Sequence, residues 1–246
     1  MKADPTDQLR LLELQALDTR LDQIAHARAT LPELAALTVL GQDSAALDRE
    51  LALDRTAVTD VQREVAKAEA DVQQVRDRAA RNQQRLDVGT GTAKDLQALQ
   101  HELVSLARRQ SELEDLEIEV MERAEDLEHQ LAALVSRRET LDAEIAAVSA
   151  RRDVAMAAFA AEAQQVSSDR AAVAPSVAEG LLALYAKIRE ASGGIGAAEL
   201  RQRRCGGCRL ELNQLDLSSI RAAASDDVVR CEECRRILVR TPESGL

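Results

Sequence analysis

Aromatic residues are nearly absent from this chain of 246 residues, which contains one Phe, one Tyr and no Trp. A domain of this length that folds around a single core normally buries several large rings, each covering about 150–250 Å². Phe159 and Tyr185 are too few for that, so the composition argues against one globular core. The sequence instead favours an elongated architecture with thin apolar seams.

Long apolar runs are also lacking. No stretch approaches the roughly 18 uncharged apolar residues expected of a membrane-spanning helix. The residues up to Asp7 lack the apolar core of a secretory signal. We therefore expect a cytoplasmic protein with no membrane contact.

Basic residues are scarce over most of the chain, whose formal net charge is -11. Residues 1–199 hold 23 basic and 36 acidic side chains, whereas residues 200–246 hold nine Arg and seven acidic side chains. Negative charge of this density repels phosphate groups. Contact with nucleic acid is therefore expected only through the C-terminal tail.

Residues that favour helices are abundant, since Ala, Leu, Glu, Lys and Arg make up 133 of the 246. This proportion is typical of coiled coils. One seam position is apolar at every seventh residue from Leu99 to Val148, and the companion position is mixed. The pattern predicts a long helix that begins near Thr92, where Asp95 completes a capping box, and ends around residues 167–169.

A second seam runs through residues 37–86 and is interrupted by Asp54 and Asn82. A third helical segment, residues 14–31, is out of phase with this seam, and the phase changes at Pro32. Proline has no amide hydrogen and clashes with the preceding helical turn. We therefore expect Pro32 either to kink one helix or to separate two.

Residues 88–92 contain Gly89 and Gly91 and separate the two long periodic regions. The flanking segments, of 81 and 78 residues, are well matched as the arms of an antiparallel hairpin. A long parallel homodimer is the alternative, but a glycine-rich break between equal arms disfavours it. The hairpin tip, which comprises Gly89, Gly91 and Lys94, is a candidate site for partner contacts.

The C-terminal part contains shorter predicted elements. Pro175 opens a helix that runs to about residue 190, and a glycine-rich segment follows it. Residues around 218–224 are expected to form one or two helical turns. Short apolar runs predict strands at 210–212, 228–229 and 237–239.

Four cysteines form two Cys-x-x-Cys pairs, Cys205 with Cys208 and Cys231 with Cys234. Tetrahedral zinc needs four thiolates at about 2.3 Å, and a two-residue gap lets one tight turn offer two of them. A redox-active dithiol is the alternative, but two pairs at this separation favour zinc. Because four thiolates leave no open coordination position, we expect one structural Zn²⁺ and neither a catalytic residue nor a small-molecule substrate.

The expected fold class is therefore mainly α. A long antiparallel coiled-coil hairpin occupies residues 1–174, with a kink near residue 32 and the turn at 88–92. A short helix and linker follow at residues 175–200. Residues 201–246 form a small zinc ribbon with short β-strands.

Arginines surround the cysteine pairs and have two interpretations. They could contact the phosphates of nucleic acid, or they could offset the charge of a zinc tetrathiolate. No aromatic residue follows Tyr185, so the stacking platform of many single-strand binders is absent. The candidate contacts for nucleic acid or a partner are Arg201, Arg203, Arg204, Arg209, Arg235 and Arg236.

Other polar residues have plainer interpretations. The three histidines are scattered without the spacing of metal ligands. The acid-rich segment at residues 112–119 is interpreted as the solvated face of the coiled coil. Neither feature indicates an enzyme.

The chain resembles a family of bacterial proteins that combine a coiled-coil hairpin with a four-cysteine zinc ribbon. The matching segments are residues 94–103, 113–115, 184–189, 205–208 and 231–238. The resemblance implies a non-enzymatic adaptor or chaperone with protein partners, although other members are described as possible nucleic-acid-binding proteins. Arg235 departs from the family pattern, in which glycine often follows the last cysteine, and this puts the geometry of the second cysteine turn in question.

Overall fold

The computed structural model describes all 246 residues and divides into two compact units. The first unit contains Met1–Leu34 and Ala150–Leu246, and the second contains Ala35–Ser149. No helix carries an apolar stretch that would let it traverse a lipid bilayer.

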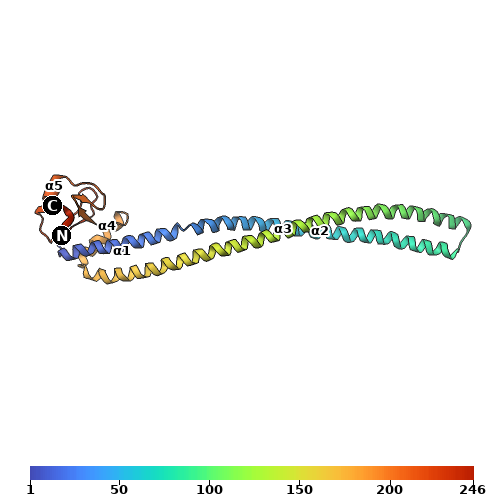
Figure 1. Cartoon of the computed structure of the whole chain (residues 1–246), viewed down its shortest axis with the longest axis horizontal. Coiled ribbons are helices and arrows are strands. Elements are labelled where there is room, and N and C mark those ends of the chain that lie inside the picture. Colours follow the sequence, from blue (N-terminus) through green and yellow to red (C-terminus); the bar gives the residue numbers. More distant parts are fainter. The chain divides into compact units, whose positions relative to one another are not determined.

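The second unit is an antiparallel pair of helices (Figure 1). It is formed by most of α2 (Pro32–Val88) and by the first part of α3 (Ala93–Val173). Their buried seam follows the predicted heptads and consists of Leu47, Leu51, Val58, Val61, Val72, Leu99, Leu113, Ala124 and Val148. The predicted intramolecular hairpin is therefore confirmed.

The reversal of the chain lies where the glycines predicted it. Gly89 and Gly91 have φ angles of 68° and 136°, which a residue with a Cβ rarely adopts. The amide of Asp95 donates to Oγ1 of Thr92 at 3.2 Å, and the amide of Thr92 donates to Oδ2 of Asp95 at 3.0 Å. These two bonds form the predicted capping box at the start of α3.

Asn82 interrupts the seam in the structure as it does in the sequence. Its side chain is buried, and the amide nitrogen Nδ2 has no hydrogen-bond partner. A buried polar residue at a seam position lowers stability but disfavours shifted pairings of the two helices. The unpartnered amide of Asn82 is therefore a locally destabilising feature of the seam.

Pro32 separates two helices. Helix α1 (Pro5–Ala29) is closed by Thr30, and α2 begins at Pro32 itself. Proline is tolerated at a first helical position because its amide hydrogen would have no partner there.

The predicted end of α3 around residues 167–169 is wrong, because the helix continues to Val173. Proline disfavours the helical conformation of the residue before it. Pro175, and not the polar residues upstream, therefore stops α3. A short 3-10 turn, Ala174–Ser176, follows and leads to α4 (Glu179–Ala191). The helix predicted to open at Pro175 therefore begins four residues later, at Glu179, and ends close to the predicted position.

The first unit has a core built from three distant parts of the sequence. Leu11 and Leu14 of α1 pack in one buried cluster with Tyr185 of α4 and with Ile237 and Val239 near the C-terminus. The base of the hairpin, the linker and the cysteine-containing tail thus all contribute to this apolar cluster.

A three-stranded sheet in the first unit has the order β2-β1-β3. The central strand β1 (Ala197–Arg201) pairs antiparallel with β2 (Arg204–Cys205) and parallel with β3 (Ile237–Arg240). The strand predicted at 237–239 is confirmed, and β1 was not anticipated as a strand.

The strands predicted at 210–212 and 228–229 are wrong. The first run supplies only an isolated bridge between Glu211 and Arg204. In the second, the Val228 amide donates to the carbonyl of Met1 at 3.0 Å, and no continuous ladder forms. Leu212, Val228 and Val229 pack against apolar clusters without forming strands, whereas Leu210 is 53% exposed.

Helix α5 (Gln214–Ala222) covers part of the predicted helical turns at 218–224 but begins earlier and ends at Ala222. Its start is fixed by Asn213, whose Oδ1 accepts a hydrogen bond from the Asp216 amide at 2.8 Å. The chain then closes with β3 and a 3-10 turn, Pro242–Ser244.

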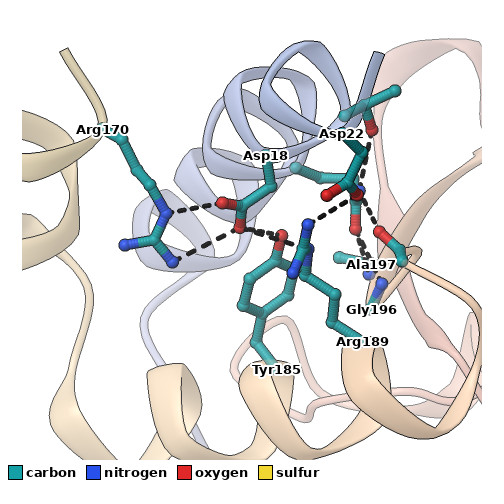
Figure 2. Close-up of polar contacts among 10 residues, drawn as sticks. Asp18, Asp22, Arg170, Tyr185, Arg189, Gly196 and Ala197 are labelled. Carbon is teal, nitrogen blue, oxygen red and sulfur yellow. Dashed lines mark hydrogen bonds and ion pairs between the residues drawn. The ribbon is translucent and has the colours of Figure 1, made fainter. Parts of the chain in front are cut away.

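A buried carboxylate joins three helices of the first unit (Figure 2). Asp18 of α1 is 3% exposed and accepts from the Tyr185 hydroxyl at 2.7 Å and from Nε of Arg170 at 2.5 Å. Arg189 of α4 lies 3.6 Å from the same carboxylate and pairs with Asp22 at 2.6 Å. Burial, together with the bond to Asp18, raises the pKa of Tyr185, so its hydroxyl keeps the proton it donates.

Gln15 connects α1 to the start of the sheet. Its Oε1 accepts from the Gly196 amide at 2.7 Å, and its Nε2 donates to the Gly194 carbonyl at 2.9 Å. Gly196 itself cannot carry a side chain, because a Cβ there would lie 2.6 Å from the Tyr185 carbonyl oxygen. The position of β1 is thus fixed by contacts with both α1 and α4.

Replacement Tyr185→Phe tests the importance of this cluster. It removes one hydrogen bond to a buried charge and is expected to lower the free energy of unfolding of the first unit by about 1.5–3 kcal/mol. Hydrogen exchange of the α4 and β1 amides in the full chain measures the effect. Lys187→Ala, at an exposed position of α4, is the control, and equal exchange in the two variants would contradict the assignment.

Candidate metal centre

The four cysteine sulfurs converge in the first unit, all within 4.8 Å of one another. Sγ of Cys205 is 3.8 Å from Sγ of Cys234, and Sγ of Cys208 is 3.9 Å from Sγ of Cys231. A tetrahedral zinc site with bonds of about 2.3 Å has an edge between sulfurs of about 3.8 Å. The predicted ligand set therefore has the spacing that one zinc ion requires.

The two cysteine pairs sit in turns with the same backbone hydrogen bonds. In the first turn, the Arg209 amide donates to the Cys205 carbonyl at 2.7 Å. In the second, the Arg235 amide donates to the Cys231 carbonyl at 2.8 Å. The substitution of Arg235 for the glycine common in the family therefore leaves the geometry of the second turn intact.

Arginine adopts a left-handed conformation at both of these positions. The φ angles are 65° at Arg209 and 62° at Arg235. This region costs a residue with a Cβ roughly 1–2 kcal/mol relative to its ordinary conformation. The surrounding turn holds each arginine there, so both positions are strained.

Burial raises the pKa of two of the four cysteines. It raises the pKa of Cys205 to about 12, against the opposing hydrogen bonds from the Cys208 and Gly207 amides. Burial likewise raises the pKa of Cys231. Zinc binds thiolates, so an incoming ion displaces protons from these sulfurs, and its affinity falls as the pH is lowered.

A small apolar cluster supports the metal centre. Cys205 and Cys231 are buried together with Leu200 of β1, Leu217 of α5 and Leu238 of β3. The sulfurs are thus held between the sheet and α5, and Cys205 itself is the last residue of β2.

Three of the candidate arginines are neutralised by neighbouring carboxylates on the exposed surface. Arg201 pairs with Glu243 at 2.8 Å and Arg235 with Glu232 at 2.8 Å. Arg204 lies 3.6 Å from a carboxylate oxygen of Glu211.

The other candidate arginines divide into one structural residue and two exposed ones. Arg236 is half-buried and donates to the carbonyls of Ile195 at 3.0 Å and Ser192 at 2.7 Å. Arg203 and Arg209 are exposed, and Arg203 donates to the Gly245 carbonyl at 3.3 Å. The six arginines therefore do not form a single basic patch that is free of other interactions.

The candidate hairpin tip belongs to the second unit. Gly89, Gly91 and Lys94 are all exposed, and Lys94 lies in the first turn of α3.

Sequence reasoning missed the residues that support the centre from outside the tail. Gln15, Asp18 and Gly196 have no spacing or motif that connects them with the cysteines. The β1–β2 turn was also missed, because Gln202 and Arg203 adopt φ angles of 46° and 63° without the Asn-Gly signal of such turns.

Replacement Arg209→Gly is expected to strengthen the metal centre. Glycine adopts the left-handed conformation without strain, but it has more conformational entropy than arginine in the unfolded chain. The net stabilisation of the folded turn is therefore expected to be at most about 1 kcal/mol. Competition with a zinc chelator measures the change in affinity. Arg221→Gly places the same substitution inside helix α5, where it is expected to weaken the ribbon. A lower zinc affinity in Arg209→Gly would contradict the assignment of strain to Arg209.

Comparisons with known proteins agree with this architecture. Residues 204–238 match a C4-type zinc ribbon domain. A Mycobacterium tuberculosis relative, the uncharacterized protein Rv2229c, is 42% identical over 98% of both chains. A solved structure from Mycobacterium smegmatis is 37% identical, with a TM-score of 0.85, over 98% of this chain and 100% of that one.

The fold is also similar to that of CT398 from Chlamydia trachomatis. That structure has a TM-score of 0.67 over 96% of this chain and 98% of its own, at 16% identity. Residues 14–193 match the family described as the CT398-like coiled coil hairpin domain. With its hairpin and its four-cysteine centre, the chain belongs to the CT398-like coiled-coil hairpin family and carries a C4-type zinc ribbon.

Proposed function

We propose that the protein is a non-enzymatic adaptor or chaperone of the cytoplasm that binds protein partners along its helical hairpin. The observation that carries the proposal is the apolar surface left outside the seam. Val104 and Ile118 of α3 and Leu53 of α2 are 66%, 55% and 71% exposed. Exposed apolar side chains on paired helices are suited to binding a further helix.

The metal is proposed to be a single structural Zn²⁺. Its four ligands, Cys205, Cys208, Cys231 and Cys234, would complete a tetrahedral site and leave no position for a substrate or an activated water. When bound, the ion contributes folding free energy to a tail that has no aromatic ring of its own. Cysteines that hold a metal and form no disulfides fit the reducing cytoplasm proposed here.

Nucleic-acid binding through the ribbon is the second candidate function. The exposure of Arg203 and Arg209 favours it. The ion pairs of Arg201, Arg204 and Arg235 with carboxylates weigh against it, because these pairs would have to be broken by a phosphate. Protein binding is therefore the preferred proposal.

Crosslinking in the native cell, followed by identification of the partners, tests the two functions. The adaptor proposal expects protein partners that are retained by Arg203→Ala with Arg209→Ala. Loss of every partner in that variant, with none lost when the hairpin tip is replaced, would contradict it. Nucleic-acid binding predicts an affinity that falls steeply with salt, and no binding at low salt would exclude it.

Replacement Cys205→Ser tests the structural metal. We expect less bound zinc and loss of protection in β1 and β3, because their core is completed by the metal centre. Most of the helical circular dichroism should remain, since the second unit has its own seam. Ala222→Ser at an exposed position is the control. Unchanged zinc content would contradict the proposed ligand role of Cys205. Loss of the whole helical signal would contradict the view that the second unit is stable without the metal.

A further inference from the structure

A groove of about 450 Å³ lies between α2 and α3 in the second unit. Its apolar lining includes Val65 of α2 and Ile118 and Met121 of α3. Ile118 is 55% exposed and Met121 is 49% exposed, so both side chains are open to solvent. The residues that line the groove belong to the second unit, whereas the four cysteines belong to the first.

The apolar residues of the groove are placed as a binding helix would need them. Ile118 and Met121 are three residues apart and lie on one face of α3. Methionine is flexible and polarisable, and it is often used where one surface must fit different side chains. The chain contains only three methionines, and one of them lies in this groove.

Carboxylates line the same groove. Glu122, Glu125 and Glu128 line it from α3, and Glu128 accepts a hydrogen bond from Gln62 at 2.9 Å. The local basic residue Arg123 is committed elsewhere, because it pairs with Glu64. The apolar lining therefore combines with negative charge that no nearby arginine neutralises.

The wider stretch of α3 strengthens this charge. Residues 112–128 contain nine acidic side chains and one basic one. Of the nine, only Glu112 and Glu114 form ion pairs, with Arg109 and Arg76. A second copy docked symmetrically on this groove would bring two such surfaces together. Nucleic acid would bring phosphates to the same carboxylates. Neither occupant matches the charge of the groove.

We infer that this groove docks an amphipathic helix of a partner protein whose apolar stripe is flanked by Lys and Arg. The stripe would fill the space beside Ile118 and Met121, and the basic side chains would pair with Glu122 and Glu125. This inference rests on the proposed protein-binding function and gives it a site and a partner chemistry. It also gives the acid-rich segment a role beyond a solvated face.

Fluorescence anisotropy with the full-length, zinc-loaded protein tests the inference. The probe is a labelled synthetic peptide of about 20 residues, with Leu at i, i+3, i+4 and i+7 and with Lys and Arg at the other positions. One comparison peptide has the same composition in scrambled order, and another has Glu in place of Lys and Arg. Only the basic amphipathic peptide is expected to bind, and more weakly at high salt.

Two groove variants separate the apolar from the ionic contribution. Ile118→Gln with Met121→Gln should raise the Kd of the basic peptide about tenfold or more. Glu122→Lys with Glu125→Lys should raise the Kd and reduce its dependence on salt. All four positions are exposed, and circular dichroism verifies that the hairpin is retained.

Matched substitutions outside the groove are the controls. Val154→Gln replaces another exposed apolar side chain of α3, and Glu139→Lys with Glu144→Lys makes the same change of charge. Both are expected to bind the peptide as the wild type does.

Several results would overturn the inference. These are equal binding of the scrambled or acidic peptide, unchanged binding by the groove variants, or an equal loss in the controls. A change of oligomeric state in Ile118→Gln with Met121→Gln, measured by sedimentation, would assign the groove to a second copy instead. If cellular partners crosslink equally to wild type and groove variants, the groove inference fails and the adaptor proposal stands. If no protein crosslinks at all, the adaptor proposal fails.

Discussion

The carboxylate of Asp18 is the point on which the first unit depends. It is buried, it accepts from Tyr185 and Arg170, and Arg189 lies beside it. A buried charge is tolerated only when such partners surround it. Removing one partner destabilises the fold, because the remaining charge stays buried without compensation. Helices α1, α3 and α4 are therefore held in one arrangement, and that arrangement sets where the sheet can form.

The cysteine centre and this polar cluster lie with two different apolar clusters, and β1 and β3 contribute residues to both. Gln15 and Gly196 fix the start of β1 against α1 and α4. The cysteine turns hold the remainder of the sheet beside Leu200 and Leu238. Because the chain has almost no aromatic rings to bury, hydrogen bonds, ion pairs and metal ligands stabilise this region. Other proteins of this size rely more on a large apolar core.

The parts that were predicted from the sequence are those with a strong local signal. Heptads gave the seam, glycines gave the turn at residues 88–92, and the spacing of the cysteines gave the metal centre. Pro175 was predicted to start a helix, but it lies in the 3-10 turn, and α4 begins only at Glu179. The effect of Pro175 on the preceding residue, and so the true end of α3 at Val173, was not predicted.

The parts that escaped prediction depend on long-range contacts or on strain. β1 is a strand because β3 and β2 lie on either side of it, and nothing in its own residues requires this. Gln202 and Arg203 turn the chain in conformations that glycine and asparagine usually supply. In the sequence, Asp18 and Gln15 look like any other polar residues of a helix. Their structural role comes from contacts with the linker, which is distant along the chain.

The parallel pairing of β1 with β3 gives the metal centre a topological role. Parallel neighbours cannot be joined by a tight turn, so the whole segment 202–236, with all four cysteines, forms the crossover between them. Closing a long loop costs entropy before the ends can pair. An ion held by both cysteine turns would divide that loop into shorter ones. The segment between β1 and β3 would then also be the connection that brings the last strand into the core.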